Sequence, residues 1–210
     1  MNYITTKKNS KIEDFLKTTK KELNKFFNFE IQEPAVMLLN SREQINSIWE
    51  QKTADWLVGG AKILNGTKNG IIFILSPDAF PKYSSHKKEE FWQVLKHEYC
   101  HIYFRQITGG SYPLWLNEGL ANYLAGQKKN GGNPLDVFSY FDEVGGGIYN
   151  VGYYWVEFLI KKFGKKKMVQ LIHGLKTERE MTPRLFADIF QNIYGFKFNR
   201  RELTIVLNNR

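Results

Sequence analysis

The stretch Val94-Leu-Lys-His-Glu-Tyr-Cys-His-Ile-Tyr-Phe104 contains the pattern H-E-x-x-H, and its apolar positions predict a buried helix. Residues four apart on a helix lie on the same face. His97 and His101 can therefore offer two imidazoles to one metal ion, and Glu98 stands beside the first of them. A carboxylate in that place can reach a water on the metal without binding the metal itself. The stretch thus predicts a zinc helix.

A second apolar stretch, Pro113-Leu-Trp-Leu-Asn-Glu-Gly-Leu-Ala-Asn-Tyr-Leu-Ala125, follows a Gly-Gly-Ser turn and predicts another helix. Glu118 lies within its hydrophobic pattern. A carboxylate is costly to bury unless it is paired or binds a metal. Two histidines and one glutamate, with water in the fourth position, form an open catalytic zinc shell, in contrast to a closed structural one. We therefore expect His97, His101 and Glu118 to bind Zn²⁺.

These stretches resemble the gluzincin metallopeptidases, most of all the catalytic domains of aminopeptidase-N-like and leukotriene-hydrolase-like enzymes. The matching residues are His97-Glu98-x-x-His101 and Trp115-Leu-Asn-Glu-Gly-Leu-Ala-x-Tyr123. A third piece, Tyr149-Asn-Val-Gly152, is similar to a Tyr-x-x-Gly motif of that family. The resemblance covers roughly residues 70 to 197, and it implies a zinc-dependent peptidase with a zincin-like fold.

The resemblance also implies roles for other residues. Glu98 would take a proton from the attacking water and pass it to the leaving amine. Tyr149 would stabilise the oxyanion with its phenol, and Tyr153 is the alternative for that role. Asn122 falls where thermolysin-like relatives carry an Asp that orients a zinc-bound histidine, and an amide makes that hydrogen bond more weakly. Three glycines, Gly145–Gly147, precede Tyr149 and could form either a hinge for it or an ordinary loop.

One departure from the family bears on the substrate. The aminopeptidases carry a Gly-x-Met-Glu-Asn motif on an edge strand, whose Glu binds the free amine of the substrate. The comparable stretch here, Gly59–Gly70, has no acidic residue. We therefore expect a peptide or protein substrate that is cut by an endopeptidase or small-peptide hydrolase, in preference to an aminopeptidase. In the family a strand aligns the substrate backbone; here that would be Ile71–Leu75 or the strand next to it, unless Ile71–Leu75 is a central core strand.

The rest of the pattern predicts an α+β fold in one zincin-like domain over residues 1–210. Residues 1–112, approximately, would form a small mixed sheet packed on the zinc helix, and residues 113–210 a mainly helical half. Strands are expected at Ala35–Leu39, Ile71–Leu75 and Trp56–Leu64, the last with Gly59-Gly60 as a bend or bulge. Turn signals stand at Asn65-Gly66 and Asn69-Gly70. The further helices are expected over residues 12–27, 41–51 (with Ser41 and Gln44 as a capping box), 135–141, 153–163, 168–175, 183–194 and, in the tail, 196–210.

The composition is that of a globular protein with a basic surface. The formal net charge of +9 comes from scattered lysines, which we interpret as a solvated surface; an acidic substrate, an anionic surface or nucleic acid are the alternatives. No nucleic-acid-binding motif is visible, which disfavours nucleic acid. No segment is long enough to span a membrane. The N-terminus lacks a signal peptide, which predicts a cytoplasmic protein if that end is native, although a secreted form with its signal removed would have the same sequence.

Two alternatives remain open at this point. The single cysteine, Cys100, excludes an intramolecular disulfide and is expected to be a small buried hydrophobe, with a redox or metal-binding role as the alternative. The alternative to a peptidase is a non-catalytic zinc module that binds a partner through its basic surface. A complete His-Glu-His-Glu set favours the enzyme, because a purely structural site has no need of Glu98.

Overall fold

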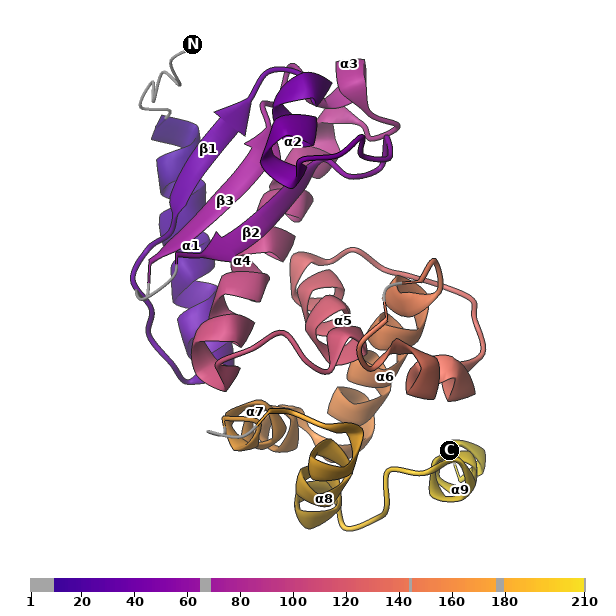
Figure 1. The fold of residues 1–210 in the computed structure, drawn as a ribbon. Helices are drawn as coiled ribbons and strands as arrows, with labels where there is room; N and C mark the ends of the chain where they lie inside the picture. The colour runs from indigo at the N-terminus through magenta and orange to yellow at the C-terminus, as the bar shows by residue number, and fades with distance from the viewer. Residues whose placement is uncertain (1–9, 65–68, 144, 177–179, 210) are drawn as a thin grey trace. The chain divides into compact units, whose positions relative to one another are not determined.

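The structure is a computed structural model that describes residues 10–64, 69–143, 145–176 and 180–209. It has an α+β fold, as predicted, in which helices predominate (Figure 1). The chain divides into two compact units, one up to Tyr103 and one from Phe104, and each is described by itself. The prediction of one zincin-like domain stays a prediction. The turn expected at Asn65-Gly66 lies outside the described residues.

The first unit is built on a three-stranded mixed sheet in the order β1-β3-β2. The strands are β1 (Ala35–Leu39), β2 (Gly59–Ile63) and β3 (Gly70–Leu75), with β3 parallel to β1 and antiparallel to β2. Because β3 lies between the other two, its Ile72, Ile74 and Leu75 side chains are fully buried. Ile71–Leu75 is therefore the central strand, and the strand next to it, β2, is an edge of the described sheet.

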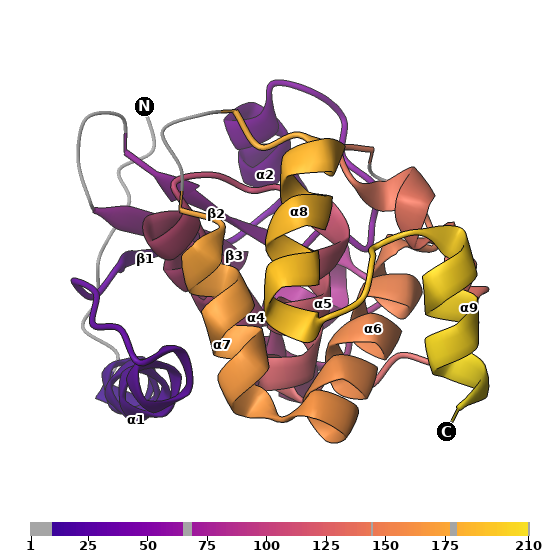
Figure 2. The ribbon, with the colours of Figure 1, turned by 90° about the horizontal axis from the view of Figure 1, so that it is seen from below.

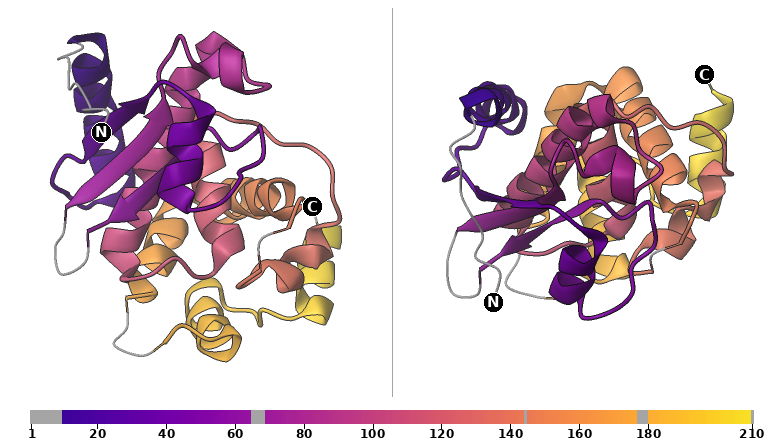
Figure 3. Two further views of the ribbon diagram at one scale, coloured as in Figure 1. Left: turned by 45° about the horizontal axis from the view of Figure 1, so that its top comes forward. Right: turned by 90° about the horizontal axis from the view of Figure 1, so that it is seen from above.

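Helices cover both faces of this sheet. The helix α2 (Arg42–Trp49) lies on one face and α1 (Ser10–Phe27) on the other, as Figure 3 shows from above. The helix with the H-E-x-x-H motif, α4 (Phe91–Thr108), lies on the same face as α1. The Phe27 and Tyr103 rings stack with centroids 5.2 Å apart, which joins α1 to α4. Two short helices, α3 (Phe80–Tyr83) and η1 (Lys88–Glu90), connect β3 to α4.

The expected bulge at Gly59-Gly60 is wrong, because β2 pairs with β3 in continuous register from Gly59 to Ile63. The reason for a glycine at position 60 is the neighbouring helix. A Cβ there would lie 2.3 Å from Cη2 of Trp49, so only glycine lets the indole of α2 lie on the strand. The predicted capping box is also incomplete: the Ser41 side chain makes no cap bond, and Oε1 of Gln44 accepts from the amide of Asn40 at 2.6 Å.

The second unit is helical. Beyond the end of α4 it comprises α5 (Leu114–Ala125), the 3₁₀ helix η2 (Pro134–Tyr140), α6 (Ile148–Phe163), α7 (Lys165–Gly174), α8 (Pro183–Tyr194) and α9 (Arg200–Asn208). Its core is aromatic: the Trp115 ring stacks parallel to Phe198 and meets Phe186 edge-on. The indole nitrogen of Trp155 donates to the carbonyl of Pro134 at 2.8 Å, which ties η2 to α6. Among the described residues no helix is long and apolar enough to cross a membrane.

Candidate metal centre

The two histidines of the predicted metal site stand on α4, which is apolar on nearly every side. The buried residues of this helix include Leu95, Tyr99 and Ile102, so most of the helix surface packs against other parts of the chain. Gly70 at the start of β3 allows this, because a Cβ there would lie 2.8 Å from side-chain carbons of Ile102. In this setting His97 and Glu98 are each 8% exposed and His101 is 6% exposed. The helix thus holds all three polar side chains away from bulk water.

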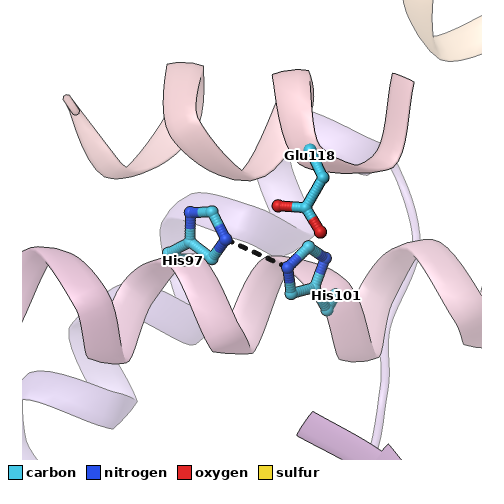
Figure 4. A group of neighbouring side chains, drawn as sticks. All are labelled: His97, His101 and Glu118. Carbon is cyan, nitrogen blue, oxygen red and sulfur yellow. Dashed lines mark hydrogen bonds between the residues drawn. The ribbon is translucent and has the colours of Figure 1, made fainter. Parts of the chain in front are cut away.

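The two imidazoles present the same nitrogen to each other. Nε2 of His97 and Nε2 of His101 lie 3.0 Å apart, with the ring planes at 84° (Figure 4). Without an ion the two nitrogens can share one hydrogen, and with one bound both can present their lone pairs to it. Two nitrogens about 2.0–2.1 Å from a tetrahedral zinc stand roughly 3.3 Å apart. The spacing of the pair therefore suits a shared metal ion.

Glu118 on α5 completes the group. One ligand atom from each of His97, His101 and Glu118 can be chosen so that all lie within 4.8 Å of one another. The carboxylate is turned towards the two imidazoles, and its Oε2 is fully buried (Figure 4). Two imidazole nitrogens and a carboxylate oxygen are common donors for a divalent transition metal. In the part of the chain that the structure describes, His97, His101 and Glu118 form a group that could hold a metal ion, as the sequence predicts.

A glycine pair fixes α5 against α6. A Cβ at Gly119 would lie 2.3 Å from the carbonyl oxygen of Gly152, and a Cβ at Gly152 would lie 2.2 Å from the carbonyl oxygen of Trp115. The backbones therefore touch directly at the residue that follows Glu118. In the sequence, Gly152 stands out only as part of the Tyr149–Gly152 motif. Its packing role could have been inferred because each of two apolar helices contains a glycine, although alanine has the higher helix propensity.

Asn122 is buried on α5, one turn after Glu118. Its side chain is 1% exposed, and its Nδ2 makes no hydrogen bond with the described residues. A buried donor without a partner is rare in folded proteins and calls for an explanation. The predicted role of Asn122 beside a metal-binding histidine stays a prediction.

The two candidate phenols both lie on α6. Tyr149 is half-buried in the first turn of the helix. One turn later, the Tyr153 hydroxyl donates to Oε1 of Glu157 at 3.2 Å. Burial, together with the charge of Glu157, raises the pKa of Tyr153 above its ordinary value. The choice between Tyr149 and Tyr153 as the oxyanion donor stays a prediction.

The glycines before Tyr149 make room for an aromatic ring. A Cβ at Gly147 would lie 2.4 Å from the hydroxyl of Tyr140, and one at Gly145 would lie 2.9 Å from a carbon of the same ring. The segment thus packs around Tyr140, and two of its three glycines have a steric reason.

Cys100 is a buried free thiol, 1% exposed, as expected for a small hydrophobe. Burial raises the pKa of the thiol well above its ordinary value, so it stays protonated near neutral pH. A protonated, enclosed thiol is a poor nucleophile.

Comparison with protein-family models, curated proteins and solved structures finds no match to this chain.

Proposed function

We propose that this chain is a zinc-dependent peptidase of the gluzincin type, in which His97, His101 and Glu118 hold the metal and Glu98 is the general base. The observation that carries the proposal is the convergence of the two Nε2 atoms and the Glu118 carboxylate, with a second buried carboxylate, Glu98, next to His97. The family resemblance of the two helical motifs supports it. The zincin-like fold belongs to the same proposal.

The donor set favours a catalytic site. Structural zinc sites are closed by four protein ligands, whereas catalytic ones have three and leave one position open. Among the described residues the group has three members, and Cys100, although it precedes His101, is not one of them. Zinc held there would act as a Lewis acid, polarising a carbonyl and lowering the pKa of a water at the open position to about 7.

The side chains around that position would handle the proton and the developing charge. Glu98 accepts a proton from the attacking water and delivers it to the leaving amine, which a carboxylate does well in a site shielded from bulk water. The Tyr149 phenol would donate to the oxyanion, with Tyr153 as the alternative donor. We assign to Asn122 the role of orienting a metal-binding histidine through a hydrogen bond to its ring.

The strand β2 would align the substrate, because a peptide can add to the edge of a sheet by backbone pairing. Its sequence from Gly59 to Ile63 contains no acidic residue. Its one charged side chain, Lys62, lies 5.1 Å from the ring centroid of Trp49, on the face of the sheet that α2 covers. The strand thus offers no carboxylate for a free amine, and this supports an endopeptidase over an aminopeptidase.

The experiment is a comparison of Glu98→Gln with Glu89→Gln, an exposed glutamate of η1 that serves as the matched control. Each variant and the wild type would be loaded with zinc, assayed for bound metal, and incubated with fluorogenic peptides with a free or a blocked N-terminus. We expect Glu98→Gln to keep its zinc and lose turnover by at least about 10³-fold, because the proton acceptor is gone. Glu89→Gln should match the wild type.

Two outcomes would contradict the proposal. Wild-type turnover in Glu98→Gln would show that Glu98 is not the base. Stoichiometric zinc without hydrolysis of either peptide class by the wild type would favour the non-catalytic zinc module. Faster cleavage of free-amine peptides than of blocked ones would keep the peptidase and overturn the endopeptidase assignment.

A further inference from the structure

A small hollow lies where the end of α4 leads into the linker to α5. Its volume is about 200 Å³. The described lining comes from the end of α4 and the linker (Thr108, Gly109, Gly110 and Tyr112) and from the segment after α7 (Leu175, Glu180 and Met181), all within the second unit. Figure 2 shows the end of α7 beside the end of α4. Pockets for whole small molecules usually measure about 300–1,000 Å³, so this one suits a single side chain. We call these seven residues the linker hollow.

The two glycines of the linker leave space in place of packing. Apart from its chain neighbours, a Cβ at Gly109 or at Gly110 would meet no heavy atom within 4 Å. Gly109 has a φ of +80°, a conformation that favours glycine, whereas Gly110 is not among the residues with a positive φ. The turn itself is held in place, because the Thr108 hydroxyl donates to the carbonyl of Phe104 at 2.8 Å and accepts from the amide of Gly110 at 3.2 Å. The open space therefore borders a fixed turn.

The walls of the linker hollow are mostly apolar. Leu175, at the end of α7, is 1% exposed, and Met181 is half-buried. The Tyr112 ring stacks on Phe141, with centroids 6.3 Å apart and planes within 8°, which fixes its position in the lining. Aliphatic and aromatic walls of this kind suit the alkyl stem of a long side chain.

The charge of the linker hollow is opposite to that of the chain. Glu180 is the one charged residue of the described lining, although the chain carries a formal net charge of +9. Its side chain is exposed and forms no ion pair or hydrogen bond with any residue that the structure describes. Lys176, next to Leu175 in the sequence, is not part of the described lining. A cation would be attracted to this carboxylate and an anion repelled.

We propose that the linker hollow binds the side chain of an arginine or lysine of a peptide, with the alkyl stem along Leu175 and Met181 and the cationic head at the Glu180 carboxylate. Long basic side chains bury their stems on apolar surface and keep their heads at the water. Hydrogen bonds between a cation and a carboxylate are stronger than neutral ones. An acidic side chain would meet repulsion, and a purely apolar one would gain nothing from Glu180.

The peptide has two possible sources. Thr108 stands seven residues, or about two turns, after His101 on α4, so a substrate of the proposed peptidase is one source. A separate peptide partner is the other. Recognition of the basic side chain is the same in both cases and does not depend on peptidase activity.

The test follows the methyl signal of Met181 by NMR in the full chain, with isotope-labelled methionine methyl groups. The chain has four methionines, and Met181→Leu assigns the signal. The probes are Nα-acetyl-arginine amide and Nα-acetyl-norleucine amide, which has an alkyl stem without the charge. We expect the arginine probe to shift the Met181 signal saturably, with the millimolar affinity of so small a ligand. The norleucine probe should bind about threefold or more weakly, because it makes no ion pair.

Two variants and a matched control locate the binding. Glu180→Gln should weaken the arginine probe by about threefold or more and leave the norleucine probe near wild type. Asp188→Asn, which removes an exposed carboxylate of α8 outside the described lining, should bind both probes as the wild type does. Gly110→Leu, whose side chain begins in the open space, should weaken both probes. Melting temperatures establish that each variant is folded.

Three results would overturn the proposal. They are a Met181 signal in the folded wild type that the arginine probe does not move, equal binding of the two probes, and equal effects of Glu180→Gln and Asp188→Asn. The NMR titration needs no turnover, so its result is separate from that of the peptidase test. Cleavage of blocked peptides with one arginine at successive positions then identifies the source. A gain at one position that Glu180→Gln cancels indicates the substrate, and probe binding without such a gain indicates a separate peptide.

Discussion

Replacing Gly152 by alanine tests how Glu118 is held. In an ordinary helix this change stabilises by about 1 kcal/mol, because alanine has the higher helix propensity. Here the added Cβ would lie 2.2 Å from the carbonyl oxygen of Trp115 and 3.0 Å from the amide nitrogen of Gly119. An ordinary contact is about 3.4 Å or more, so α5 and α6 must separate by about 1 Å. Both clashing groups are helix backbone, which cannot rotate away as a side chain can.

The expected loss of stability in Gly152→Ala follows from these opposing effects. Overpacking a well-filled interface costs about 1–3 kcal/mol and more where the neighbours are rigid, so we expect Gly152→Ala to lose about 2 kcal/mol net. Because Glu118 precedes the contact residue Gly119, its carboxylate should shift, and zinc affinity should fall about tenfold or more. Gly119→Ala should behave alike. The double variant should cost less than the sum of the two, because one separation relieves both clashes.

The assay is urea unfolding together with zinc titration against a chelator. Gly174→Ala in α7 is the matched control: its Cβ would meet only side chains, at 3.2 Å from Ile189 and 3.5 Å from Ile193, so any loss of stability should stay under about 0.5 kcal/mol. A Gly152→Ala protein as stable as the wild type and equal in zinc affinity would refute the close α5–α6 contact as the device that places Glu118.

Two further predictions concern the stability of the fold. Burial raises the pKa of four neutral acids, which are Cys100, Tyr99, Tyr103 and Tyr194. The folded chain then retains protons that the unfolded chain loses above pH 9 to 10. The free energy of unfolding should therefore fall as pH rises in that range, by up to about 1.4 kcal/mol per pH unit for each group. Urea midpoints that stay constant from pH 9 to 11.5 would contradict this. Arg42 donates to the carbonyls of Ala54 and Asp55 at 3.1 and 2.9 Å, and also to Leu57 and Tyr83. Lysine lacks the planar guanidinium group, so Arg42→Lys should lower the free energy of unfolding by about 2–4 kcal/mol in urea and expose residues 53–58 to proteolysis. A loss under about 0.5 kcal/mol would show that these hydrogen bonds contribute little to stability.

The sequence was most informative where one physical requirement dominates. The helix around His97 was predictable because its apolar positions and the four-residue spacing of the histidines agree, and it is observed over Phe91–Thr108. Ala35–Leu39 was predictable as a strand because turn residues bound a short apolar run. The predicted helix over Pro183–Tyr194 ends at Gly195, which has a positive φ, as a helix C-cap favours.

Features that depend on distant contacts could not be predicted. Gly60 resembled a bulge because the sequence does not reveal that Trp49 packs on it. Which strand lies at the edge depends on the order in which the strands pair. The sequences of β2 and β3 are each compatible with an edge position and with a central one. The glycine pair at 119 and 152 involves residues 33 positions apart, and its role appears only when α5 and α6 are seen in contact.

The most direct test of the central claim is the amount of zinc bound per chain, measured by elemental analysis of wild type and Glu118→Ala purified without chelators. Asn117→Ala, the neighbouring buried residue on α5, controls for disturbance of the helix. The proposal predicts about one zinc per wild-type chain, a marked loss in Glu118→Ala, and near wild-type zinc in Asn117→Ala. A folded wild type that takes up no zinc even after it is added back would contradict the metal centre, and with it the peptidase.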